Sequence, residues 1–331
     1  MTKPSKHNKQ TDVFAPPEGD LGLAAEPGNT ASTPRDSKSP PASSPGAEPA
    51  SIFPLIDQPL APEIKLGIAD DAYHADKRFV SSSGVKQAMR SAASWRAFLE
   101  RKNEPTDAMK FGTLAHLAIL EPERFKKQVV TLPDFGNMRT NAAKEARAEY
   151  LAQLPPGCIF GTAEEMSDLN GMVEAILAHE DAVMILKRCT PEVSGYYVDK
   201  ATGLWCKVRA DILDLERTEF LFDLKTTKNS RRERFASDIW DFKYNVQLYM
   251  YAHGVKAITG KMPEHCGFIA VEKTAPFEVE VFLADENMMR RGREGYELGM
   301  RTIEKAVRTR SFPRRSAGMV EIALPGYTDF Q

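Results

Sequence analysis

The 331-residue chain has few cysteines, no long apolar run and almost no net charge, at −2. Its four cysteines are far apart and unevenly spaced, so they match neither a disulfide framework nor a zinc or iron–sulfur motif. No window approaches the about 18 apolar residues of a membrane span, and no apolar leader or phosphate-binding glycine motif is visible. We therefore expect a cytoplasmic protein with reduced thiols, no membrane partner and no ATP hydrolysis. The cysteines are Cys158, Cys189, Cys206 and Cys266.

Proline is abundant only at one end, where more than half of the 22 prolines lie before Glu63. The same stretch is rich in serine and alanine and has few aromatic or branched apolar residues, a composition typical of disorder. We expect a disordered tail over residues 1–65. Residues 66–331 are long enough for one large α/β domain with a real core.

Hydrophobic periodicity predicts helices first and strands later. The helices expected in the first half cover Ser83 to Lys102, Met109 to Leu120, Asn141 to Leu154 and Ala163 to His179, the last with Thr162 as N-cap and Glu165 three residues on. Strands are expected over Val193–Val198, Leu204–Asp214 and Phe220–Thr226, then a tyrosine-rich helix within Asp241–Ile258, strands over Cys266–Glu272 and Phe277–Phe282, and a helix over Glu286–Arg308.

The segment RADILDLERTEFLFDLKTT, residues 209–227, carries the strongest chemical signal. Strand alternation in its second half puts Asp223 and Lys225 on the face opposite Phe222. In the first half it puts Asp211 on one side, and Ala210 and Ile212 on the other. A polar turn between the halves predicts a hairpin that brings Asp211 near Asp223. Lys207 and Arg209 are expected on the side of Asp211, and Cys206 and Val208 on the other.

Two carboxylates in one cleft repel each other unless a cation lies between them, and oxygen ligands favour magnesium or manganese. Such an ion activates water and neutralises charge on a phosphoryl oxygen, while a nearby lysine can position the nucleophile. This is the chemistry of phosphodiester hydrolysis. A lone Asp-x-Lys is more often an exposed pair on a solvated strand, so the interpretation depends on the neighbouring motifs.

Three further residues belong to those motifs. Glu192, in PEVSGYY, is expected on a preceding strand, although by itself it is an ordinary glutamate. Gln247 lies between Tyr244 and Tyr251 at helical spacing, and a buried amide needs partners for both its donor and its acceptor. His116, on an apolar helix, has the small residue Gly112 one turn before it; a histidine in such a place is usually a core residue, but here a metal could approach closely.

The ordered motifs resemble the PD-(D/E)XK nucleases and, within them, the RecE-type exonuclease domain (exodeoxyribonuclease VIII) of phages and prophages. The resemblance covers about residues 66–315 and rests on order and spacing. The motifs are FVSSSGVKQAM, AMKFGTLAHLAILEPERF, PEVSGYY, the K-x-R-x-D of Lys207–Asp211, DLKTT, NVQLYMYAHG and IAVEKTAPFEV. The resemblance implies an αβββαβ core with a central mixed sheet flanked by helices, after a helical N-terminal part.

The resemblance also implies a set of site residues and an activity. Its magnesium site, in which manganese could substitute, corresponds to His116, Glu192, Asp211 and Asp223; Lys225 is the catalytic lysine, and Gln247 and Tyr251 support it. The implied activity is digestion of linear duplex DNA from a 5′ end to leave 3′ overhangs, by a homo-oligomer that serves a single-strand annealing recombinase. An endonuclease of the same superfamily, or a non-catalytic DNA-binding or scaffold protein that kept the fold, are the alternatives.

Basic residues after the catalytic strand are the predicted DNA contacts, because local charge matters more than the near-zero sum. A basic run is otherwise a solvated face, and for the final helix, which carries nine Arg and Lys between Arg290 and Arg315, both interpretations stay open. The predicted phosphate contacts are Lys228, Arg231, Arg232 and Arg234.

Overall fold

The computed structural model describes residues 61–101, 106–155, 157–316 and 318–322. Most of the tail expected over residues 1–65 lies outside them. The boundary drawn at residue 65 is too late, because Glu63–Lys65 form strand β1, which pairs antiparallel with the strand that carries Glu192. The side chains of this short strand are partly exposed, which leaves no hydrophobic signal in the sequence.

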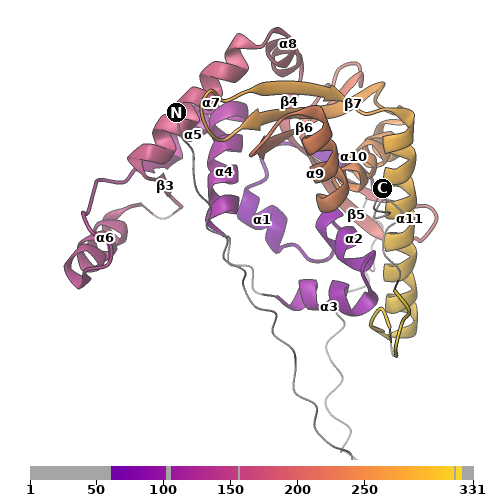
Figure 1. The fold of residues 1–331 in the computed structure, drawn as a ribbon. Helices are drawn as coiled ribbons and strands as arrows, with labels where there is room; N and C mark the ends of the chain where they lie inside the picture. The colour runs from indigo at the N-terminus through magenta and orange to yellow at the C-terminus, as the bar shows by residue number, and fades with distance from the viewer. Residues whose placement is uncertain (1–60, 102–105, 156, 317, 323–331) are drawn as a thin grey trace, which may run out of the picture. The chain divides into compact units, whose positions relative to one another are not determined.

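A mixed six-stranded sheet is the centre of the fold (Figure 1). Its strands lie in the order β1-β4-β5-β6-β7-β8, and every neighbouring pair is antiparallel except β6 and β7. This confirms the predicted α/β class with helices on both faces of a mixed sheet. The strands after β1 are β4 (Thr190–Val198), β5 (Trp205–Leu213), β6 (Phe220–Thr227), β7 (His265–Glu272) and β8 (Val279–Leu283).

Two apolar clusters cover the two faces of the sheet. Helices α2, α3, α10 and α11 pack on the face that holds Val208, Leu221 and Phe268. Helices α4, α7 and α8 pack on the face that holds Phe222 and Ile269. The bounds of these helices are α2 Ser82–Ala88, α3 Ala92–Glu100, α4 Asp107–Leu120, α7 Ala163–Ala178, α8 Glu180–Arg188, α10 Tyr244–Thr259 and α11 Glu286–Thr309.

Helices α4, α6, α7 and α11 begin and end within two residues of the predicted positions, and Thr162 and Glu165 form the expected capping box. The helix predicted over Ser83–Lys102 is instead two helices, because Ser91 accepts a hydrogen bond from the backbone N–H of Ser94 and starts a new helix. Four helices were not predicted or not separated from a neighbour: α1 (Asp70–Ala75), α5 (Pro122–Gln128), α8 and α9 (Arg232–Phe242).

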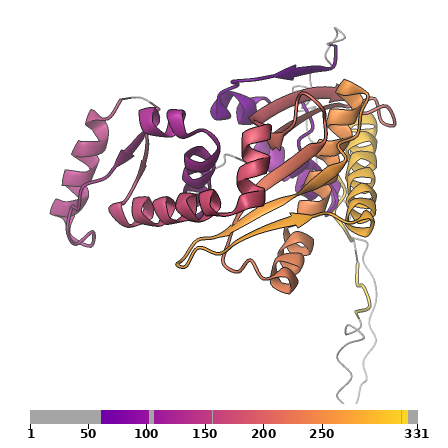
Figure 2. The same cartoon turned by 90° about the horizontal axis from the view of Figure 1, so that it is seen from above.

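A smaller part of the domain lies away from the main sheet. Strands β2 (Val129–Thr131) and β3 (Ile159–Gly161) form a parallel pair, and α6 (Asn141–Gln153) lies between them in the chain. Figure 2 shows α6 on the far side of α7 from the sheet. Within the described residues, no helix is long and apolar enough to cross a membrane.

Strand β5 departs from the expected alternation at one point. Val208 and Ala210 face α10, as does Leu213, while Ile212 faces α4 and α7 with Phe222. The prediction that Ile212 lies on the side of Ala210 is therefore wrong. The change of side falls at Asp211, next to the place where β5 stops pairing with β6.

Candidate active site

The strands β5 and β6 separate where the sequence placed the acidic residues. They pair only through Ile212 with Phe222 and Leu213 with Leu221. One step further, the Oδ2 atom of Asp211 accepts a hydrogen bond from the backbone N–H of Leu224, at 2.9 Å. A carboxylate therefore takes the place of a main-chain partner, and the gap between the strands opens at this point.

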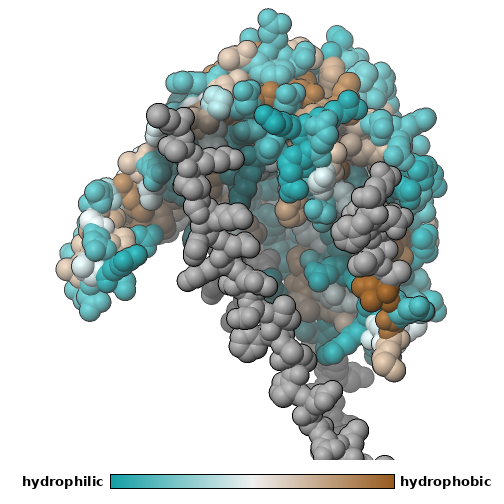
Figure 3. Space-filling model, viewed as in Figure 1, coloured by the Kyte–Doolittle hydropathy of each residue, from teal (hydrophilic) through white to brown (hydrophobic). Residues whose placement is uncertain are grey.

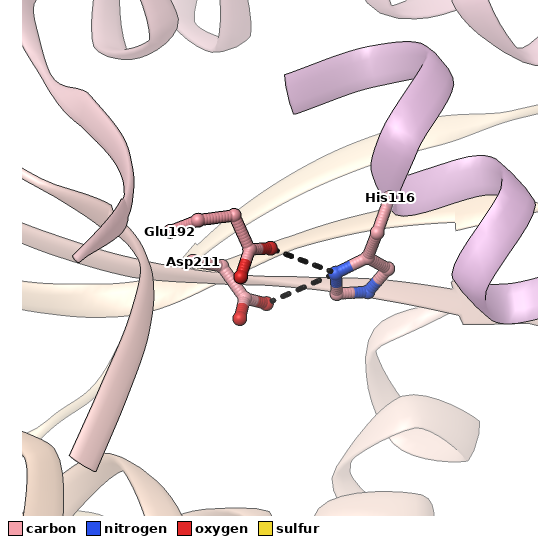
Figure 4. Close-up of side chains that lie close together, drawn as sticks. All are labelled: His116, Glu192 and Asp211. Carbon is pink, nitrogen blue, oxygen red and sulfur yellow. Dashed lines mark ion pairs between the residues drawn. The ribbon is translucent and has the colours of Figure 1, made fainter. Parts of the chain in front are cut away.

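Three side chains from three elements meet beside this gap (Figure 4). The Nδ1 atom of His116 on α4 lies 3.7 Å from Oδ2 of Asp211 on β5 and 3.9 Å from Oε1 of Glu192 on β4. One ligand atom from each lies within 4.8 Å of the others. The backbone at Glu192 has a φ of 52°, an unusual value for a residue with a side chain. The paired strands place Glu192 opposite Asp211, because Pro191 pairs with Ile212 and Val193 with Ala210.

The charges of this cluster are strongly coupled. Burial, reinforced by the charge of Asp223, raises the pKa of Asp211 to about 7. Burial by itself would lower the pKa of His116, but the carboxylates of Asp211 and Glu192 outweigh it, so that this pKa is raised. A buried acid that holds its proton near neutral pH next to a second acid is the electrostatic condition that a bound cation would relieve.

Asp223 and Lys225 form a second group on β6. Asp223 is 1% exposed and its Oδ2 atom makes an ion pair with the Lys225 ammonium. Burial opposes the charge of Lys225, but Asp223 and Asp211 raise its pKa above the ordinary value, so the lysine stays protonated. Asp223 is therefore buried and the side chain of Lys225 is only 14% exposed, which excludes the alternative of an exposed pair on a solvated strand.

Helix α10 supports this pair from the other side. The Nε2 atom of Gln247 donates to Oδ1 of Asp223 at 2.8 Å and to the hydroxyl of Tyr251 at 3.3 Å. The Lys225 ammonium lies 4.7 Å from the centre of the Tyr244 ring. Gln247 and Tyr251 therefore lie beside β6, as expected, but Gln247 contacts Asp223 and not Lys225.

A cavity of about 240 Å³ opens onto the three-residue cluster. Its walls include His116, Glu192, Asp211 and Tyr251, whereas Asp223 and Lys225 are not part of its lining. The remaining lining residues are Asp70, Tyr73, His74, Gly112, Thr113, Leu117, Glu121 and Arg209.

The ligand atoms present fit a divalent cation. One imidazole nitrogen and several carboxylate oxygens suit magnesium or manganese. The Oδ2 atom of Asp223 is buried and, apart from its ion pair, accepts no hydrogen bond within the described part of the chain, so it has a lone pair to offer. Of the proposed ligands, His116, Glu192 and Asp211 have ligand atoms within 4.8 Å of one another, and Asp223 lies outside that group of three.

The predicted DNA contacts lie outside the cavity and are all exposed. Lys228 and Arg231 follow β6, while Arg232 and Arg234 begin α9. Arg234 is paired with Asp238 one turn later. Among the described residues, no ion pair involves Lys228, Arg231 or Arg232.

Several residues of the site had no role assigned from the sequence. Arg209 lies in the K-x-R-x-D motif, two residues before Asp211, and donates to Asp70 at 2.6 Å and to the carbonyl of Ile68. Its guanidinium lies 4.1 Å from the centre of the Tyr73 ring. These contacts hold α1 over the cavity. Alternation already placed Arg209 on the face of Asp211, but its hydrogen-bond partners lie far earlier in the chain, and no local pattern indicates them.

Comparison with known proteins identifies a family and a fold. A family model described as a PDDEXK-like domain of unknown function (DUF3799) matches residues 81–323. A crystal structure of a candidate exonuclease from Eubacterium rectale superposes with a TM-score of 0.52 at 13% identity, covering 79% of this chain and 97% of that one. The structure of the protein SSO0001 gives a TM-score of 0.22 at 14% identity, over 56% and 85% of the two chains. No curated protein sequence matches the chain.

Proposed function

The chain belongs to the PDDEXK-like family DUF3799, and we propose that it is a divalent-metal-dependent DNA exonuclease. The observation that carries the proposal is the ion pair of Lys225 with the buried Asp223, near the cluster of His116, Glu192 and Asp211. Surplus negative charge and one protonated lysine at a break in a sheet form an arrangement suited to phosphodiester hydrolysis.

Each residue has a distinct role in the proposed reaction. His116, Glu192, Asp211 and Asp223 would hold Mg²⁺, or Mn²⁺ in its place. The bound ion would supply an activated water and neutralise charge on the phosphoryl group. Lys225 orients the attacking water, while Gln247 and Tyr251 keep Asp223 in place. Asp211 must lose its proton for the ion to bind, which sets a requirement on pH.

The finer features of the proposal rest on the resemblance to RecE-type exonucleases of phages and prophages. They are linear duplex DNA as substrate, digestion from the 5′ end to leave 3′ overhangs, a homo-oligomeric enzyme and a single-strand annealing recombinase as partner in recombination. Lys228, Arg231, Arg232 and Arg234 would contact phosphates of the duplex, because they are exposed beside the catalytic strand. The likeness of fold to the candidate exonuclease from Eubacterium rectale agrees with this class of activity.

The test is digestion of a linear duplex labelled separately at each end, with Mg²⁺ and with EDTA, alongside a covalently closed circle. We expect label release from the 5′ ends, none in EDTA, and an intact circle. Cutting of the circle would replace the proposal with an endonuclease. No cleavage of any DNA, together with no Mg²⁺ binding by calorimetry, would indicate a non-catalytic protein.

Replacement of the catalytic lysine gives the residue-level test. Lys225→Ala should lower cleavage at least about a hundredfold, the usual loss for a group that stabilises the transition state. Because this change leaves Asp223 buried and unpaired, Lys225→Gln provides a second variant. Thermal unfolding checks that each variant is folded. Lys256→Ala, on the exposed side of α10, is the matched control and should retain activity. Cleavage by folded Lys225 variants at the wild-type rate would refute the assignment.

A further inference from the structure

A second lysine approaches the catalytic strand from helix α2. Lys86 is partly buried, and its Nζ atom donates a hydrogen bond to Oε1 of Gln247 at 2.8 Å. The same ammonium lies 5.4 Å from the centre of the Tyr244 ring, which Lys225 also approaches. Among the described residues, no carboxylate lies within ion-pair distance of Lys86. This lysine is thus held near the active site without an acidic partner.

The environment of Lys86 is unfavourable for a charge. Burial, and then the positive charge of Lys225, lower the pKa of Lys86 to about 7, and the carboxylate of Asp223 opposes them only in part. A charged lysine is more stable next to a carboxylate or in contact with water than in a partly buried position without an acidic partner. Its position is therefore better explained by what it does to Gln247.

In its protonated form Lys86 can only donate hydrogen bonds, whereas a glutamine amide can present either end. Lys86 donates to the amide oxygen of Gln247, and this bond keeps the oxygen on the side of Lys86. The nitrogen then turns towards Oδ1 of Asp223, at 2.8 Å, and the hydroxyl of Tyr251. Without Lys86, the amide oxygen would have no donor in this set of contacts, and the amide could rotate away from Asp223 to find one.

The fold keeps Lys86 in place. Ser81 caps α2 by accepting from the backbone N–H of Gly84, and Val85 is fully buried under α11. A Cβ atom at Gly299 of α11 would lie 2.8 Å from the carbonyl oxygen of Val85, so the two helices are in close contact. The lysine that follows Val85 therefore reaches α10 from a fixed helix.

We propose that Lys86 is a positioning residue of the nuclease reaction, which fixes the Gln247 amide so that its nitrogen holds the metal-binding carboxylate of Asp223. The inference rests on the proposed function, because Asp223 is a ligand only if the protein binds a cation. It adds to the site a residue on α2 that acts through Gln247 and touches neither the ion nor the DNA. Loss of such an outer partner of a metal ligand costs about 10- to 100-fold in metal affinity or activity.

The test is a double-mutant cycle on the full chain. Lys86→Met should lower kcat about 10- to 100-fold and raise the Mn²⁺ dissociation constant measured by calorimetry, with little change in the KM for duplex DNA. In a Gln247→Leu background, where there is no amide to orient, Lys86→Met should change both quantities by no more than about twofold. Lys86→Arg keeps a donor of similar reach and should restore part of the loss.

Three controls keep the outcomes separate. Lys256→Met removes a charge from the exposed face of α10 and should behave as wild type. If Lys86→Met does not fold, Lys86→Gln replaces it; its amide can donate or accept, so it does not fix Gln247, and the same loss is expected. Wild-type protein that neither cleaves DNA nor binds Mn²⁺ would overturn the proposed function itself.

Three results with active wild-type protein would overturn the role of Lys86. They are an unchanged kcat and metal affinity in Lys86→Met, a loss that is equally large in the Gln247→Leu background, or a loss confined to the KM for DNA. The last two would mean that Lys86 acts independently of Gln247, for example as a direct phosphate contact.

Discussion

Two buried aspartates three residues apart, Asp211 and Asp214, have opposite electrostatic surroundings. Asp211 is enclosed with other acids, and burial raises its pKa to about 7. Asp214 accepts hydrogen bonds from the backbone N–H groups of Glu216, Arg217 and Glu219. Burial by itself would raise the pKa of Asp214, but these donors lower it below the ordinary value. One aspartate closes a turn, and the other is held at a cost to stability, as expected of a functional site.

The buried carboxyl group of Asp211 should lower the thermal stability of the metal-free protein at high pH. The pKa of Asp211 is higher in the folded chain than the 3.8 of the unfolded chain, so the folded state binds more protons between about pH 4 and pH 7. Its contribution is therefore present below this window and is lost as pH rises through it. Asp211→Asn, which keeps an oxygen acceptor for the Leu224 N–H, should raise Tm in EDTA at pH 8 by at least about 2–4 °C. The difference should vanish near pH 4.

Asp214→Asn is the matched control for that measurement. Because the folded-state pKa of Asp214 is lowered, its contribution is present above its unfolded pKa and is lost as pH falls through the folded one. This variant should therefore be less stable than wild type at pH 8. Thermal melts of both variants across a range of pH measure these differences. A Tm of Asp211→Asn at or below that of wild type at pH 8 in EDTA would contradict the raised pKa of Asp211.

Local alternation places only part of the predicted site, because the roles of His116, Glu192, Gln247 and Tyr251 came from the family resemblance. Asp211, Asp223 and Lys225 belong to two strands joined by a short turn, and a period of two suffices to bring them near each other. Lys86 and Asp70 reach the site from helices that are distant in the chain from their partners, Gln247 and Arg209. Such contacts depend on helix packing, which one sequence does not reveal.

At the scale of elements, three glycines let α11 lie close to its neighbours. Cβ atoms added at Gly292, Gly295 and Gly299 would each lie less than 3 Å from atoms of α10 or α2. At Gly292 the nearest atom is the main-chain oxygen of Asn245, at 2.3 Å, two residues before Gln247. Glycine is unfavourable in a helix, so its presence here reflects contact between backbones.

We predict that Gly292→Ala destabilises the fold. Alanine gains about 1 kcal/mol in a helix interior, but overpacking against a backbone atom costs about 1–3 kcal/mol, and a main-chain oxygen cannot move aside. The control is Gly112→Ala in α4, whose Cβ would meet nothing within 4 Å. Thermal unfolding should show a lower Tm for Gly292→Ala and a Tm about 2–4 °C higher for Gly112→Ala. Equal shifts in the two variants would contradict the close approach of α11 to α10.

The helices that were predicted correctly differ from the missed ones in length and in their capping residues. Helices α4, α7 and α11 are long and have side-chain N-caps, so that periodicity and capping agree. Helix α9 was missed because it has no side-chain cap, so no capping signal marks its start after β6. The chain then turns at Lys243, a residue other than glycine with a φ of 56°. A left-handed residue that is not glycine or asparagine leaves no signal in a sequence.

At the scale of the whole molecule, the charges on α11 and around the start of α9 are arranged differently. The arginines of α11 are paired with glutamates three or four residues away on the same helix, at Glu294, Glu297 and Glu304. Figure 3 shows that hydrophilic residues cover most of the viewed face. Charge pairs of this kind favour a solvated helix over a phosphate track. The three basic residues Lys228, Arg231 and Arg232, by contrast, have no acidic partner within the described residues.

This difference predicts which basic residues contribute to DNA binding. Each phosphate contact releases a counterion, so the logarithm of the binding constant falls with the logarithm of salt concentration, with a slope that counts such contacts. Replacing Lys228, Arg231 or Arg232 with glutamine should reduce that slope by about 1 for each residue and weaken binding equally for all sequences. Arg290→Gln, Arg293→Gln and Arg301→Gln on α11 remove the same charge and should leave the slope unchanged. Fluorescence anisotropy of a labelled duplex in EDTA, titrated from low to high salt, measures the slope without cleavage.

A reduced slope in the α11 variants alone would contradict this assignment. It would mean that the duplex binds along α11, away from the cluster of His116, Glu192 and Asp211.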